Sequence, residues 1–374
     1  MRSFAEVTAY VQSKKLGKWV GGYIHDRFSR MFAPSVPGTR HLIFAICDHY
    51  EPLWGGAPET VGQKRVGDWL EQYPKLANEF RDADGHHPRH SFFFPAEQYS
   101  PWFLDRLGEL AKGGYGEVEL HLHHDGDTAD KLRADLLSYL DMYAQHGHLT
   151  RDENGRKRYA FVHGNWCLSN ARKDGRWCGV NEELTVLFDT GCYADFTFPS
   201  APDETQPNIV NRIYWPVGDL SKRGAYKTGK RAHVGEVKKD RILIIQGPLA
   251  LSWCKRKIPI RIENADLTGK NPGTKSRAKV WVDQNIHVVG RPEWVFVKVH
   301  THGAPEKNSI SLLGEGGCDL HRVLTRGYND GERWVLHYVT AREMYNIAVA
   351  AMSGESGNPN EYRDYVLSPP PIAR

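Results

Sequence analysis

Strand-like and helix-like segments alternate along the first 145 residues of this chain, and this order restricts the folds open to it. The run His41–Cys47 is continuously apolar, which is typical of a strand buried on both faces. Shorter apolar runs follow at 90–94 and 116–122. Segments with apolar residues at three-to-four spacing lie after each strand, at 61–80, 101–111 and 128–145. Such alternation favours parallel strands joined by right-handed helical crossovers, so we predict an α/β fold.

The pattern is less regular after residue 148. Asp152–Gly155 is a hairpin turn signal, and a long Gly- and Lys-rich loop precedes the apolar run at 241–246. A strong strand pattern returns at Glu293–Val299, and a strand and helix at 334–351 close the chain. We predict a helical extension over 1–35, in which Phe4, Val7, Val11 and Val20 form a short amphipathic helix. A single barrel-like domain over 36–374 follows, with an insertion around 148–290.

Composition narrows the class of protein and its setting. The chain has 374 residues, of which 40% are hydrophobic and 25% charged, as in ordinary globular proteins. The net charge of +4 is small for this length, so no nucleic-acid partner is predicted. None of the six cysteines forms a C-x-x-C pair, which favours reduced thiols and a cytoplasmic location. No apolar run approaches the ~20 residues of a membrane span. The oligomeric state is left open.

The segment Gly116–Asp125 (GEVELHLHHD) concentrates potential metal ligands. Residues two apart on a strand face the same way, so Glu119, His121 and His123 share one face, and the apolar residues between them share the other. Asp125 follows just past the strand end. Imidazole nitrogens and carboxylate oxygens are typical ligands of a divalent ion such as Zn²⁺. The alternative is a partly exposed edge strand that is rich in histidine and binds no ion.

Two other predicted strands also end in polar groups. Asp48 and His49 follow the first strand, and His300 and His302 follow the late strand at 293–299. The carboxyl ends of parallel barrel strands converge on one face. One acid and two histidines around an ion, with an open position for water, form a catalytic metal site that supports hydrolysis of an ester, amide or phosphoester. Asp48 is the expected base and His302 the expected acid. The predicted substrate contacts are His49, Asn165, Trp166 and His300.

These motifs resemble the polysaccharide deacetylase branch of the glycoside hydrolase/deacetylase superfamily. Phe92-Phe93-Phe94, the helix at Pro101 and the GEVELHLHHD run follow the family's order, with Glu117 and His121 in register. Ile46-Cys47-Asp48-His49 is similar to the family's first motif. Val297–His302 is similar to its late strand that ends in a catalytic histidine, and Tyr338–Glu343 to its closing strand and helix. Residues 150 to 290 have no counterpart.

The resemblance implies a distorted (β/α) barrel of about seven strands. It also implies a zinc-like ion held by one Asp and two His, and removal of an N- or O-acetyl group from a carbohydrate in cell-surface polysaccharide synthesis. The family's paired aspartates correspond to Asp48-His49 here, so Asp48 is either base or ligand. The family's second metal histidine falls on Asp125, so Asp125 or His123 completes a metal set with Asp48 and His121. The family's Arg-containing third motif is not visible.

Three other functions remain open. A glycoside hydrolase on a related barrel needs two carboxylates that flank the scissile bond, such as Asp48 with Glu51 or Asp195. A metal phosphoesterase needs two ions and more carboxylates. A non-catalytic carbohydrate-binding or scaffold relative predicts an intact barrel without a metal.

Overall fold

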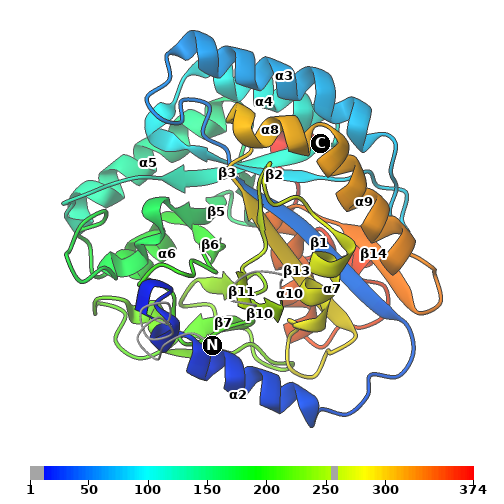
Figure 1. Cartoon of the computed structure of the whole chain (residues 1–374). Helices are drawn as coiled ribbons and strands as arrows, with labels where there is room; N and C mark the ends of the chain where they lie inside the picture. Colours follow the sequence, from blue (N-terminus) through cyan, green and yellow to red (C-terminus); the bar gives the residue numbers. More distant parts are fainter. Residues whose placement is uncertain (1–11, 254–259) are drawn as a thin grey trace.

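A large parallel sheet organises the computed structural model, which describes residues 12–253 and 260–374 (Figure 1). Within this part of the chain, seven strands run parallel in one path, next to an eighth, short parallel strand at its end. In sheet order they are β13 (Trp294–Thr301), β1 (Arg40–His49), β2 (His90–Pro95), β3 (Gly116–Leu122), β5 (Lys157–His163), β6 (Cys192–Asp195) and β9 (Leu243–Ile245). The predicted α/β class and the parallel order of its strands are confirmed.

Further strands extend this path, branch from it or form a separate pair. β14 (Trp334–Tyr338) pairs with the first half of β1, and β2 pairs with its second half. β12 (Asp266–Leu267) adds a short parallel strand beside β13. The region predicted as an insertion supplies the antiparallel strands, which are the hairpin strand β4 (Thr150–Arg151), β7 (Ile213–Pro216) and β8 (Gly229–Arg231), and the separate pair β10 (Ala250–Trp253) and β11 (Ile260–Glu263).

The sheet curls until its two ends meet, which makes a distorted barrel. Lys298 on β13 donates from Nζ to the carbonyl oxygens of Phe196 (2.6 Å) and Phe198 (2.9 Å), which follow β6. A Cβ on Gly247, just after β9, would lie 2.3 Å from the carbonyl oxygen of Lys298, so the two backbones are in close contact. The inner faces of β1, β2, β5, β6, β7, β9 and β13 form one buried cluster with α10 (Ala341–Met352). The barrel is therefore closed by packing rather than by a continuous ladder.

Helices cover the outside of the barrel (Figure 1). The outward apolar residues of β3 (Val118, Leu120, Leu122) belong to a second buried cluster that includes residues of the surrounding helices. This agrees with the predicted two-residue alternation, and the burial of every β3 residue excludes the edge-strand alternative. The covering helices are α3 (Glu59–Ala77), α4 (Pro101–Lys112), α5 (Ala129–Gln145), α6 (Glu183–Thr190), α7 (Lys275–Asp283), α8 (Glu306–Leu312) and α9 (Glu315–Tyr328).

The described part of the N-terminal segment contains α2 (Val20–Met31). Trp19 and Tyr23 anchor it, because they pack in a buried cluster with Val210 and Leu249. Phe4, Val7 and Val11 of the predicted amphipathic helix lie outside the described residues. Among residues 12–253 and 260–374, no helix combines the length and apolar character needed to cross a bilayer.

Candidate functional site

A cluster of buried metal-ligand residues lies at the carboxyl ends of β1 and β3. His49 ends β1, Glu51 follows two residues later, and His121 lies near the end of β3. One ligand atom from each of these three residues lies within 4.8 Å of the others. All three are at most 4% exposed. We call His49, Glu51 and His121 the His121 centre.

The hydrogen bonds of His121 determine which of its nitrogens faces this centre. Nδ1 lies 2.7 Å from the carbonyl oxygen of Val162, which can only accept, so Nδ1 carries the proton. Nε2 then presents a lone pair, 3.5 Å from Glu51 Oε1. Both of these buried atoms lack a hydrogen-bond partner within the described residues. A charged pair in contact would close to about 2.8 Å. A histidine that binds a metal typically donates one ring N–H to a carbonyl oxygen and directs its other, unprotonated nitrogen toward the ion. His121 has this arrangement.

The electrostatics of the centre suit a cation. Burial lowers the pKa of His49 well below its usual value, and the neighbouring imidazoles of His302 and His121 lower it further, so His49 is neutral. Burial alone would raise the pKa of Glu51, but His121 and the other nearby histidines outweigh it, and the net shift is downward. Two imidazoles and one carboxylate are a donor set for Zn²⁺.

His302, the residue directly after β13, adjoins the centre. Its Nε2 lies 3.7 Å from Glu51 Oε1, and its ring centroid lies 4.8 Å from that of His49. Burial lowers the pKa of His302, although the negative charge of Glu51 partly offsets this. The structure therefore brings three of the predicted site residues together around Glu51, namely His49, His121 and His302.

Asp48 does not face the His121 centre, which differs from its predicted role as ligand or base. Its Oδ2 lies 2.8 Å from His90 Nε2, and its Oδ1 accepts the backbone N–H of Gly303 at 2.6 Å. The reason is the alternation of side chains along β1, which directs Asp48 and His49 to opposite faces. Asp48 thus holds the turn that follows His302 and acts, in this geometry, as a positioning residue.

His123 and Asp125 also lie outside the His121 centre. His123 Nδ1 is 2.6 Å from Glu97 Oε1. Burial would lower the pKa of His123, but its hydrogen bond to Glu97 raises it overall. Asp125 Oδ1 accepts the backbone N–H of Trp177 at 2.6 Å. His123 does lie beside His121 as predicted, with ring centroids 4.6 Å apart, but its Nδ1 is engaged by Glu97.

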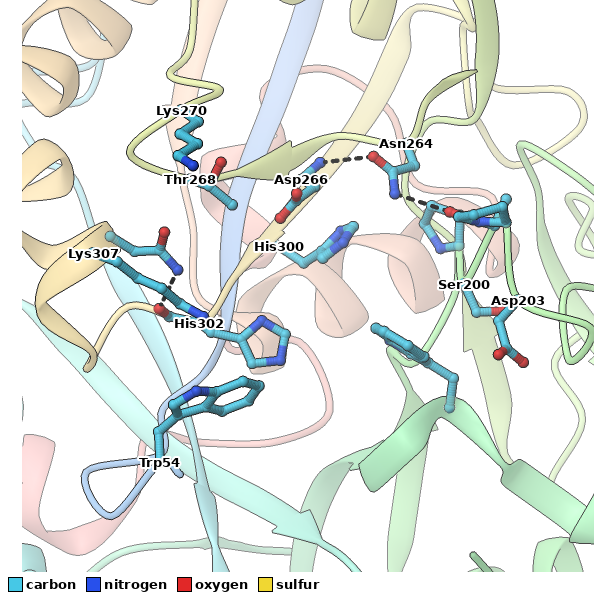
Figure 2. A pocket seen from close by; sticks show the side chains of 15 residues that line it. Trp54, Ser200, Asp203, Asn264, Asp266, Thr268, Lys270, His300, His302 and Lys307 are labelled. Carbon is cyan, nitrogen blue, oxygen red and sulfur yellow. Dashed lines mark hydrogen bonds between the residues drawn. The ribbon is translucent and has the colours of Figure 1, made fainter. Parts of the chain in front are cut away.

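A cavity of about 650 Å³ adjoins the centre through His302, which is one of its lining residues; Figure 2 shows this cavity. His300 and His302 lie along it, with Trp54 next to His302 at a ring-centroid distance of 4.9 Å. Lys307 Nζ lies 4.7 Å above the Trp54 ring. The remaining wall includes Trp166, Ser200, Asp203, Asn264, Asp266, Thr268 and Lys270. Aromatic faces beside many hydrogen-bonding groups are suited to a polar ligand with flat apolar faces.

The predicted substrate contacts divide into two groups. Trp166 and His300 line the cavity, whereas His49 belongs to the buried centre and Asn165 only precedes a lining residue. From the sequence, Glu51 is a candidate only as a glycosidase carboxylate. Its position just after a strand-end histidine is nevertheless a signal for a role in the site. Glu117, which the resemblance places in register, pairs with Arg342 at 2.8 Å near the opposite end of β3 and therefore has a structural role.

Comparisons with known proteins show a distant structural likeness. No protein-family model matches the chain, and no curated protein matches its sequence. The structure is similar to the crystal structure of 4-α-glucanotransferase from Thermococcus litoralis, with a TM-score of 0.41 and 12% identity. The likeness covers 80% of this chain and 39% of that chain, so this chain spans about two fifths of that protein's length. Similarity at this level does not assign a family or an activity.

Proposed function

We propose that this protein is a metal-dependent hydrolase that removes an acetyl group from a carbohydrate. The observation that carries the proposal is His121, whose free Nε2 is buried, lacks a partner among the described residues and faces Glu51 Oε1 beside His49. These three residues would hold a divalent ion, with zinc the best match to their chemistry. Such an ion supplies Lewis acidity and lowers the pKa of water.

The residues around the cavity would supply the other requirements of the reaction. The faces of Trp54 and Trp166 would stack on sugar rings, and the polar wall would bind hydroxyl groups. His302 lies between the cavity and Glu51, so its Nε2 is placed to hold or transfer a proton at the reacting acyl group. Asp48 would keep this histidine in place through Gly303. The acetyl group itself is inferred from the resemblance of the strand-end motifs to deacetylases.

Two measurements test this proposal. Elemental analysis should show that His121→Ala loses about one equivalent of metal relative to the natural protein, whereas His25→Ala, at an exposed position on α2, does not. An assay with acetylated amino sugars should show release of acetate without new reducing ends, and His121→Ala should abolish that release. Equal metal in all three proteins would remove the proposed site, and new reducing ends would replace the deacetylase with a glycosidase.

A glycoside hydrolase remains a second candidate because two carboxylates line the cavity. They are Asp203 and Asp266, whereas Asp48, Glu51 and Asp195 do not line it. Asp203 is ion-paired with Arg172 at 2.9 Å, and burial raises the pKa of Asp266. Glycoside hydrolysis uses two carboxyl groups, one that is charged and one that is more readily protonated. New reducing ends that disappear in Asp266→Asn would favour this function.

A further inference from the structure

We infer a second metal site, closed and structural, formed by His124, His163, Cys178 and Glu183. We call these residues the Cys178 centre. One ligand atom from each lies within 4.8 Å of all the others. The four residues come from the ends of β3 and β5, the loop between β5 and α6, and the first turn of α6. The proposal does not depend on the function proposed above.

The distances within the Cys178 centre suit tetrahedral coordination. Glu183 Oε1 lies 3.1 Å from His124 Nε2 and 3.4 Å from His163 Nε2. Cys178 Sγ lies 3.4 Å from Glu183 Oε2. Ligands at tetrahedral zinc, with bonds of ~2.0–2.3 Å, are roughly 3.3–3.8 Å apart. All four ligand atoms lie within 4.8 Å of one another, so side-chain shifts would bring them around one ion.

His163 carries the outer hydrogen bond of a metal ligand, whereas His124 has a carboxylate nearby but, among the described residues, no hydrogen bond at its Nδ1. His124 Nδ1 lies 3.2 Å from Asp127 Oδ2, and His163 Nδ1 donates to the carbonyl oxygen of Gly164. Each histidine thus turns Nε2 toward the centre. His163 is fully buried, and its Nε2 has no hydrogen-bond partner within residues 12–253 and 260–374. A buried free nitrogen aimed at a carboxylate and a sulfur is the feature that a metal ion would satisfy.

Backbone amides hold the two side chains that would carry negative charge around an ion. Ser169 N–H donates to Glu183 Oε2 at 2.6 Å, which leaves Oε1 facing the histidines. Asn170 and Val180 donate their N–H groups to Cys178 Sγ at 3.3 and 3.4 Å. One thiolate and one carboxylate would balance the two charges of Zn²⁺, so the buried unit would be neutral. Sulfur, nitrogen and oxygen ligands together favour zinc over magnesium or calcium.

The number of protein ligands separates this site from a catalytic one, since burial is shared with the His121 centre. His163, Cys178 and Glu183 have no exposed surface, and four protein ligands leave no position for water. A role for Cys178 as a nucleophile is excluded by the same burial, because no substrate reaches its sulfur.

The site explains how the loop between β5 and α6 keeps its shape. Five of its non-glycine residues have left-handed backbone angles, with φ between 50° and 69°, namely Asn165, Trp166, Ser169, Asn170 and Trp177. Such angles are unfavourable for residues with a side chain unless the surroundings hold them. An ion shared by β3, β5, Cys178 and α6 would hold this loop, and with it Trp166 at the cavity wall.

X-ray absorption on the zinc-loaded protein tests the inference without any variant. We expect a zinc–sulfur contribution at about 2.3 Å. The His121 centre contains no sulfur ligand, so this signal reports only on the Cys178 centre. Coordination by nitrogen and oxygen alone would overturn the inference, whatever the protein's activity.

Substitution provides a second test. Cys178→Ser should lose about one equivalent of zinc together with the sulfur signal, and should unfold at a lower temperature. Cys167→Ser is the matched control, because Cys167 is buried in the same loop and donates to Arg176 O at 3.2 Å. It should retain both metal and signal, and His121→Ala should retain the sulfur signal. Full metal content in Cys178→Ser would contradict the site, and if this variant does not fold, the wild-type spectrum decides.

Discussion

His121 donates its Nδ1 proton to the carbonyl oxygen of Val162 on the neighbouring strand, and this bond directs its other nitrogen toward Glu51. The orientation of the imidazole is therefore set by the pairing of β3 with β5, in which His121 lies opposite Val162. A ligand held in this way needs little reorganisation when an ion binds.

Glu51→Gln tests whether the carboxylate is a ligand. It removes the negative charge that Glu51 contributes to the His121 centre, so we expect zinc affinity at this centre to fall by at least about 10–100-fold. Competition with a chromogenic chelator measures this change. Glu97→Gln is the control, because Glu97 contacts His123 outside the centre. Unchanged affinity in Glu51→Gln would exclude Glu51 from the ligand set.

Asp48→Asn separates positioning from metal binding. The amide side chain of this variant can still accept the Gly303 N–H but lacks the charge that faces His90. We expect the free energy of unfolding in urea to fall by about 1–3 kcal/mol, with metal content unchanged. Loss of a metal equivalent in a folded variant would show that Asp48 is a ligand after all.

Trp54→Ala and Trp166→Ala test the cavity as a carbohydrate site. Loss of one stacking face should raise KM by about tenfold, which corresponds to ~1.4 kcal/mol, with little change in kcat or metal content. Steady-state kinetics on an acetylated oligosaccharide measure the effect. Trp102→Ala, on α4 and not among the cavity-lining residues, should keep the original KM. The assignment fails if the two cavity variants match this control.

Gly303→Ala tests the close packing behind His302. A Cβ on Gly303 would lie 2.1 Å from Asp48 Oδ2 and 2.9 Å from the Trp69 ring. We expect a loss of about 1–3 kcal/mol in unfolding free energy and a marked loss of activity, because His302 must shift. The control Gly67→Ala, in α3 with open space around its Cβ, should be neutral or stabilising by up to about 1 kcal/mol. Normal stability in Gly303→Ala would contradict this packing.

Asp195 predicts a pH dependence of stability. Burial raises its pKa from 3.8 to about 7, and Thr197 accounts for its hydrogen bonds. The native state thus keeps this proton after the unfolded chain has released it. The stabilisation is complete below pH 3.8 and is lost as the pH rises through about 7.

Urea unfolding between pH 5 and 8 measures this contribution. The natural protein should lose about 2–3 kcal/mol more over this range than Asp195→Asn, which has no proton to release. Parallel pH profiles for the two proteins would show that Asp195 does not titrate in this way.

The order of strands and helices was predictable because the two-residue alternation of strands and the three-to-four spacing of helices are both local patterns. The His-rich run on β3 alternates between apolar and polar residues, so its buried and inward faces could also be assigned, and His121 was placed correctly at the inner face. The first strand carried no such signal. It is apolar on both faces because both are buried, so its sequence could not show that His49 rather than Asp48 faces inward.

The residues that complete each cluster were the least predictable. Cys178 and Glu183 are separated in sequence from His124 by more than 50 residues and lie in an irregular loop and at the start of a helix. No local periodicity relates such positions, because loop paths depend on backbone angles and on contacts made after the sheet has formed.

By itself, the sequence determined the alternation of strands and helices, the parallel sheet and the gathering of histidines at strand ends, since these follow from local patterns and from the geometry of parallel strands. Three features depend on long-range contacts: which of two adjacent residues on β1 faces the centre, the position of Glu51 beside His121, and the approach of a distant cysteine and glutamate to His124 and His163. Those features depend on how the sheet curls and on which strands become neighbours, and both are settled by packing over the whole chain.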